Sequence, residues 1–145
     1  HIIPDPWLRD RVTRQGDLSH YNSCNVLSLH ALLGAYSDEG AQWLDELLPV
    51  LADNIRYACD FIAAHFPGVQ VMQPQGTYML FLDCAAWLQE HHMTLRELEE
   101  RGARAGVIWQ DGAAFAWPDS IRMNLALPHS RLVEAMEHLR VHAFC

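Results

Sequence analysis

One arginine stands out among the residues of this sequence that could take part in binding or catalysis. From residue 121 to 126, apolar and polar residues alternate as in a half-buried strand, and Arg122 lies on the polar face. A planar guanidinium can bind a carboxylate through two parallel hydrogen bonds. Two interpretations are open: Arg122 lies on an exposed sheet face or pairs with an acidic residue of another element, or it binds an anionic ligand.

Other titratable residues are weaker candidates. His138 and His142 are four residues apart near the C-terminus, and Cys145 follows them. This spacing suits a metal ion, but a third ligand is missing, so the pattern favours a solvated helix face and predicts no metal site. Asp83 and Asp111 each end a predicted strand, where a carboxylate is usually a turn residue.

Charge and residue types exclude several classes of function. The formal net charge is −8, so a nucleic-acid partner is not expected. All ten basic residues are arginines, and without a lysine the chain can form neither a Schiff-base site nor a phosphate-loop lysine site. The four cysteines form no CxxC pair, so we expect buried free thiols in a reducing compartment.

Length and composition fit a single ordinary globular domain. The chain has 145 residues, and half of them are apolar. No apolar run approaches the length of a membrane span, and the first residues lack the features of a signal peptide. We therefore expect a protein that has no membrane partner.

Apolar periodicity, caps and breakers predict the helices. We expect helices that cover residues up to about 14, 19–36, 37–66, 94–104 and 130 onward. Gly16 is predicted to break the chain after the first helix, and Ser19 and Ser130 to cap the second and the last. Thr94 and Glu97 have the spacing of a capping box.

Alternating or β-rich stretches predict four short strands. They cover residues 69–72, 77–82, 106–109 and 121–126, and turn residues separate them. Helices precede, divide and follow these strands along the chain. The sequence therefore predicts an α+β sandwich, with a small sheet and helices packed on it.

Several stretches, taken in order, carry a family resemblance. They are Ile2-Ile3-Pro4-Asp5-Pro6, Asn25-Val26-Leu27, Ala35-Tyr36, Gly40, Trp43-Leu44-Asp45, Pro74-Gln75-Gly76-Thr77-Tyr78-Met79-Leu80-Phe81-Leu82-Asp83, Gly106-Val107, Asp111-Gly112, Phe115 and Arg122-Met123-Asn124-Leu125-Ala126-Leu127-Pro128. Their order and spacing resemble the C-terminal part of a pyridoxal-phosphate (PLP) enzyme of the class I/II aminotransferase superfamily. More narrowly, they resemble the MalY/PatB branch, the C–S lyases similar to cystathionine β-lyase. This resemblance implies the small C-terminal domain of a fold-type-I PLP-dependent transferase, with a mostly antiparallel sheet.

The resemblance implies a role for three residues. Arg122 matches the arginine that binds the α-carboxylate of the substrate, and Gly76 and Tyr78 would lie near the substrate. The parent reaction would convert cystathionine to homocysteine, pyruvate and ammonia, with transamination as the close alternative. PLP is bound in this family by a lysine, which this chain lacks. We therefore expect no catalytic, cofactor-binding or metal-binding residue in this chain, and no activity or cofactor binding by the chain alone.

The resemblance also implies how the chain is organised. Residues 1–35 would be a remnant of the large PLP-binding domain with the start of the interdomain helix, and residues 36–145 the small C-terminal domain. The chain would be a fragment of a cytoplasmic, dimeric enzyme, and its partner would be the missing N-terminal half or a second copy. The alternative is a module derived from that domain, which binds amino acids or associates with itself without catalysis.

Overall fold

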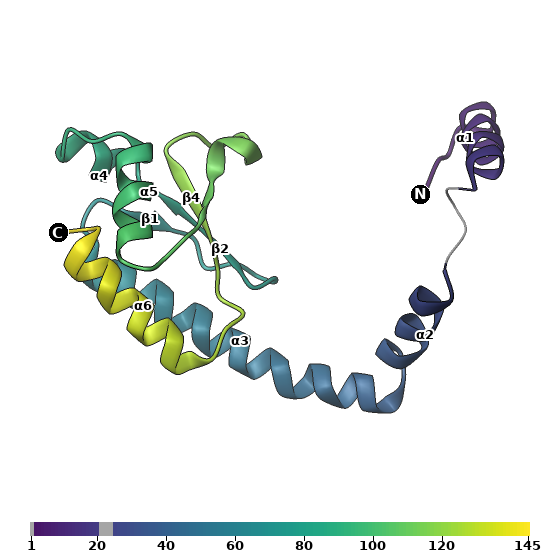
Figure 1. Cartoon of the computed structure of the whole chain (residues 1–145), viewed down its shortest axis with the longest axis horizontal. Helices are drawn as coiled ribbons and strands as arrows, with labels where there is room; N and C mark the ends of the chain where they lie inside the picture. The colour runs from purple at the N-terminus through teal and green to yellow at the C-terminus, as the bar shows by residue number, and fades with distance from the viewer. Residues whose placement is uncertain (1, 21–24) are drawn as a thin grey trace. The chain divides into compact units, whose positions relative to one another are not determined.

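The computed structural model describes residues 2–20 and 25–145, and the chain divides into two compact units, His1–Leu44 and Asp45–Cys145. The helices are α1 (Pro6–Ser19), α2 (Val26–Ala35), α3 (Asp38–His65), α4 (Ala85–Glu90), α5 (Leu95–Arg104), the short 3-10 helix η1 (Gly112–Phe115) and α6 (His129–His142) (Figure 1). The strands are β1 (Gln70–Val71), β2 (Met79–Asp83), β3 (Gln110–Asp111) and β4 (Ser120–Asn124). Within the described ranges, the helices are too short or too polar to cross a membrane.

The start of each N-terminal helix is set by a side-chain cap. The Asp5 carboxylate accepts a hydrogen bond of 2.7 Å from the Leu8 amide at the start of α1. The Asn25 side chain accepts one of 2.8 Å from the Ser28 amide at the start of α2. The Ser37 hydroxyl accepts one of 3.1 Å from the Gly40 amide at the start of α3.

The expected break at Gly16 and cap at Ser19 are wrong. Helix α1 continues through Gly16 to Ser19, since one glycine within a helix costs only about 1 kcal/mol. The Ser19 hydroxyl donates back to the Gln15 carbonyl, at 2.9 Å, and so belongs to the last turn of α1. Ser130 is likewise no cap, because α6 begins one residue earlier, and the Pro128 carbonyl accepts from the Arg131 amide.

The second unit is built on a four-stranded antiparallel sheet with the strand order β1-β2-β4-β3. In the register of the two central strands, Phe81 lies opposite Arg122 and Leu80 opposite Met123. Leu80 and Met123 are buried, whereas Phe81 and Arg122 are half-buried on the other face. This arrangement of helices and an antiparallel sheet confirms the predicted α+β fold class.

The capping box of α5 is confirmed, but the strand predicted before β4 is displaced. Thr94 and Glu97 exchange the two hydrogen bonds of the box. Strand β3 begins only at Gln110, so residues 106–109 are not a strand. Helix α4 and the 3-10 helix η1 were not predicted. Both lie in segments for which the sequence predicts loops.

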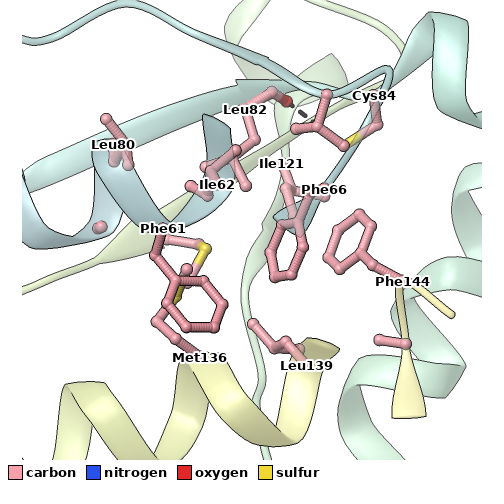
Figure 2. Close-up of a cluster of buried hydrophobic side chains, with 14 of the residues drawn as sticks. Phe61, Ile62, Phe66, Leu80, Leu82, Cys84, Ile121, Met136, Leu139 and Phe144 are labelled. Atoms are coloured by element: carbon pink, nitrogen blue, oxygen red, sulfur yellow. Dashed lines mark hydrogen bonds between the residues drawn. The ribbon is translucent and has the colours of Figure 1, made fainter. Parts of the chain in front are cut away.

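One hydrophobic core holds the second unit together. Its side chains come from the C-terminal half of α3, the inner face of the sheet and α6 (Figure 2). Helices α4 and α5 contribute further side chains, among them Trp87 and Leu98. Phe66 follows α3 and stacks on Phe144 after α6, with ring centroids 4.3 Å apart. Trp87 of α4 is fully buried and meets Phe144 edge to face at 5.2 Å. The C-terminal end of this unit is therefore joined to the end of α3 and to α4 by aromatic contacts inside the core.

The cysteines are only partly as expected. Cys84 is a buried free thiol, and burial raises its pKa to about 12, with a smaller contribution from the Asp83 and Asp119 carboxylates. Cys59 is half-buried and Cys145 is exposed, so the expectation of buried thiols is wrong for Cys145. The prediction for Cys24 lies outside the described residues.

Candidate functional site

Arg122 lies at the centre of the sheet face that is turned away from the core. It is the middle residue of β4, and it pairs with Phe81 of β2 on one side and Gln110 of β3 on the other. The neighbours Ile121 and Met123 point into the core and fix the orientation of the strand. The alternation of the sequence thus correctly predicts which face carries the arginine.

The guanidinium is held at two points. Its Nη1 donates a hydrogen bond of 2.6 Å to Oε1 of Gln110. Its Cζ atom lies 4.6 Å from the centroid of the Phe115 ring, in a cation–π contact. Phe115 in turn meets Phe81 edge to face at 5.6 Å. Arg122 is therefore fixed over an aromatic surface.

The charge of Arg122 is not neutralised by an acidic side chain of the described residues. Their ion pairs belong to Arg56, Arg96, Arg131 and Arg140, each with an acidic residue three or four positions away on the same helix. The intramolecular salt bridge that the sequence left open for Arg122 is thus not found in this part of the chain. A cation in such a setting can take an anionic ligand.

A groove lies beside Phe81 on the same sheet face, with a volume of about 660 Å³. Its lining includes Val71 of β1, Met79 and Phe81 of β2, and Trp117. Trp117 stacks on Phe81, with an angle of 12° between the ring planes. These two aromatic side chains therefore lie between the groove and Arg122. The groove is mostly apolar, as is usual for small-molecule sites.

Gly76 and Tyr78 lie in the connection between β1 and β2, next to this groove. Their neighbours Gln75 and Thr77 line it, whereas Gly76 and Tyr78 do not. A side chain at position 76 would meet open space, so packing does not explain the glycine. Tyr78 is exposed, and its carbonyl accepts a hydrogen bond of 2.8 Å from the Leu125 amide. The substrate-side role of these two residues stays a prediction.

The two strand-end aspartates have local roles. Asp83 accepts a hydrogen bond of 3.0 Å from the Ala85 amide at the start of α4, and Asp111 accepts one of 2.7 Å from the Ala113 amide in η1. Both are therefore turn residues, as the sequence favours. Nδ1 of His138 donates a hydrogen bond of 3.2 Å to the backbone carbonyl of Ala105. No cluster of three or more possible metal ligands occurs within residues 2–20 and 25–145.

The sequence did not reveal the partners of Arg122. Gln110 is twelve residues away, and its place follows from the register of β3 with β4. Phe115 belongs to the family resemblance, but its contact with the guanidinium depends on η1. The next residue, Ala116, adopts a left-handed conformation with φ 59°, where glycine is the unstrained residue.

Comparison with known proteins gives this site a family context. No protein-family model matches the chain. The cystathionine β-lyase PatB of Bacillus subtilis is 30% identical over 115 residues, which are 79% of this chain and 28% of PatB. The MalY protein of Escherichia coli is 32% identical over 122 residues, which are 81% of this chain and 30% of MalY. The chain thus spans less than a third of the length of these relatives.

The fold agrees with this relationship. A PLP-bound protein of Clostridium difficile 630, assigned as an aminotransferase, has a TM-score of 0.84 at 28% identity. The match covers 99% of this chain and 36% of that protein. The chain is therefore homologous to the C-terminal part of the MalY/PatB cystathionine β-lyases, and it has the fold of the corresponding part of PLP-dependent aminotransferases.

Proposed function

We propose that this chain supplies the substrate-carboxylate arginine of a PLP-dependent C–S β-lyase of the cystathionine β-lyase type, or of an aminotransferase. The observation that carries the proposal is Arg122 itself: a half-buried, mid-strand cation on the outer sheet face, without an acidic partner among the described residues. A carboxylate would pair with the guanidinium and hold the amino acid in one orientation.

We assign the cofactor to another polypeptide segment. None of the 145 residues is a lysine, so the residues of this chain do not fit the covalent attachment of PLP. When bound in the parent enzyme, PLP supplies the electron sink for chemistry at the α-carbon. The role of this chain in the parent enzyme is to bind and orient the substrate. We propose that the chain contains no catalytic or cofactor-binding residue.

We also propose the domain roles that the resemblance implies. Residues 1–35 would belong to the large domain and the start of the interdomain helix, and residues 36–145 would form the small domain. Along the chain, the boundary between the two compact units lies between residues 44 and 45, within α3. Gly76 and Tyr78 would lie on the substrate side of the small domain. A cytoplasmic location remains an expectation.

The proposal is supported by the apolar surface of the first unit. All described residues of α2 are exposed, although five of its ten residues are large and apolar: Val26, Leu27, Leu29, Leu32 and Leu33. A helix that is apolar on all sides is normally buried. We propose that α2 is covered in the parent enzyme by the missing N-terminal half or by a second copy.

Without that cover, the chain is expected to self-associate through α2. Size-exclusion chromatography with light scattering should show a mass above 16.5 kDa. Leu29→Glu combined with Leu33→Glu should shift the chain towards the monomer, because charges on an apolar interface are costly to bury. Ala64→Glu, at an exposed position of α3, is the matched control and should change nothing. A wild-type chain that is monomeric at high concentration would contradict the expectation.

Complementation tests the proposed activity. The chain is mixed with PLP and the part of B. subtilis PatB that precedes the matched region, and cystathionine is added. We expect the absorbance of protein-bound cofactor, and the release of pyruvate, ammonia and homocysteine, only when both polypeptides are present. An aminotransferase would leave the C–S bond intact, so the absence of a thiol product together with amino-group transfer identifies that activity. If the mixture neither retains the cofactor nor turns over substrate, the enzymatic role is rejected.

The second candidate is a non-catalytic module that binds amino acids or associates with itself. The exposed apolar residues of α2 favour self-association, and the free charge of Arg122 favours amino-acid binding. Amino-acid binding or a stable oligomer, in a chain that fails to complement, would support this candidate.

A further inference from the structure

The Arg122 side chain is long, and holding it still costs conformational entropy. An ordered guanidinium therefore needs partners that offset this entropy cost. The structure provides two, the side-chain amide of Gln110 at 2.6 Å and the ring of Phe115 at 4.6 Å. Both partners lie on the outer sheet face, where the side chain would otherwise be free to rotate in solvent.

These partners are positioned by separate parts of the fold. Gln110 lies directly opposite Arg122 in the β3–β4 register. Phe115 ends η1, whose start is capped by the Asp111 carboxylate, and its ring meets Phe81 of β2 edge to face. The contacts of Arg122 therefore depend on the sheet register and on η1, and they are not a chance meeting of two surface side chains.

Both partners are electrically neutral. An amide oxygen and an aromatic face attract a cation, but neither carries a formal charge that would compete with a ligand carboxylate. Gln110 uses one of the five donors of the guanidinium, and the described residues contain no acceptor that bonds to the other four. A glutamate at position 110 would have nearly the same shape, yet it would form an ion pair and neutralise the site.

We propose that Gln110 and Phe115 are positioning residues, which hold the Arg122 guanidinium in place while leaving its charge available for a substrate carboxylate. This inference rests on the proposed function of Arg122 and adds to it. The choice of glutamine over glutamate at position 110 sets the affinity for carboxylate ligands. Phe115 restricts the guanidinium to the aromatic surface beside Phe81.

The test is carried out on the full chain by NMR, with the Nε–H signal of Arg122 as the reporter. Two probes are titrated, L-methionine and L-methioninamide, which differ only in the carboxylate that the amide lacks. The wild-type chain should prefer methionine. Gln110→Glu should lower the affinity for methionine about tenfold and remove the preference, because an ion pair replaces the ligand. Gln110→Met adds no charge but loses the hydrogen bond to Nη1, so it should retain the preference while weakening methionine binding about two- to fivefold.

Two further variants complete the design. Phe115→Leu keeps an apolar side chain but removes the π face, and it should weaken methionine binding about two- to fivefold. Gln89→Glu places the same new charge at an exposed position of α4 and should leave the preference unchanged.

Each outcome has a separate meaning. A Gln110→Glu chain that keeps the wild-type preference would overturn the inference while the role of Arg122 stands. Equal losses for Gln110→Glu and Gln110→Met would overturn it too, since the absence of a charge at position 110 would then add nothing to the hydrogen bond. A wild-type chain without any preference would reject the carboxylate role of Arg122, and the inference would fall with it.

Discussion

Replacing Asn54 with leucine is expected to lower the free energy of unfolding of the second unit by about 2–4 kcal/mol. Asn54 lies on α3 and is fully buried. Its Nδ2 donates to the carbonyls of Leu125 and Leu127, at 3.0 and 2.9 Å, and its Oδ1 lies 2.9 Å from Nδ1 of His129. Leucine would fill the space but take one hydrogen bond from each of these three groups, and the buried Leu125 carbonyl would keep only the bond from the Leu127 amide, at 3.0 Å.

The two carbonyls also fix the orientation of the amide. Because the Asn54 NH₂ group faces both carbonyls, its oxygen faces His129, and Nδ1 of that histidine must carry the proton. One side chain thus ties α3 to the chain that leaves β4 and to the first turn of α6. Since Arg122 lies only three residues before Leu125, this tie also secures the strand that carries the candidate site.

Urea unfolding followed by circular dichroism measures the effect of Asn54→Leu. Asn124→Leu is the matched control, because Asn124 is exposed and accepts only one local hydrogen bond, from the Ala126 amide at 2.8 Å. The control should change the free energy of unfolding by less than about 1 kcal/mol. If both variants unfold at the same urea concentration, the hydrogen bonds of Asn54 contribute nothing beyond ordinary packing.

The elements that depend on local chemistry could be predicted from the sequence. The capping box of Thr94 and Glu97 satisfies backbone amides within one turn, and Pro67-Gly68 ends α3 because proline cannot continue a helix. The alternation of residues 121–125 correctly places Ile121 and Met123 in the core and Arg122 on the outer face. These features are decided by neighbours within a few residues.

The features that the sequence did not predict depend on contacts between residues far apart in the chain. Asn54 lies within the apolar stripe of α3, and its partners are 71 and 73 residues away in the sequence. Helix α4 has only six residues, and it forms because Trp87 and Leu88 are buried against the core. The stretch 106–109 resembles a strand, but Trp109 packs over Gly102 and towards Phe144 instead. Tertiary packing decided each of these positions.

Only part of the candidate site could be predicted from the sequence. The type and face of Arg122 could be inferred from the sequence, because alternation alone gives the face. Its two contacts could not be inferred, because they require the register of β3 and the turn of η1. Whether Arg122 forms an ion pair or keeps a free charge therefore depends on tertiary contacts, and the free charge makes its replacement costly for substrate binding.

Arg122→Gln is expected to reduce kcat/KM for cystathionine at least about 100-fold in the complemented mixture of this chain and the N-terminal part of PatB. A charge-assisted pair with a carboxylate contributes about 1.5–3 kcal/mol, and loss of substrate orientation adds to the cost. Arg122→Lys keeps the charge but loses the planar fork, so we expect a smaller loss of about tenfold.

Two controls separate a loss of binding from a loss of structure. Arg56→Gln makes the same change at an exposed arginine of α3, which pairs with Asp53 on the surface, and should leave activity unchanged. Arg122→Gln should also unfold within about 1 kcal/mol of the wild type, because its side chain is only half-buried. Equal activity of the Arg122→Gln and Arg56→Gln mixtures would reject the carboxylate role. A loss of activity at unchanged stability would mean that the sheet supplies the fixed positive charge against which the amino acid is oriented.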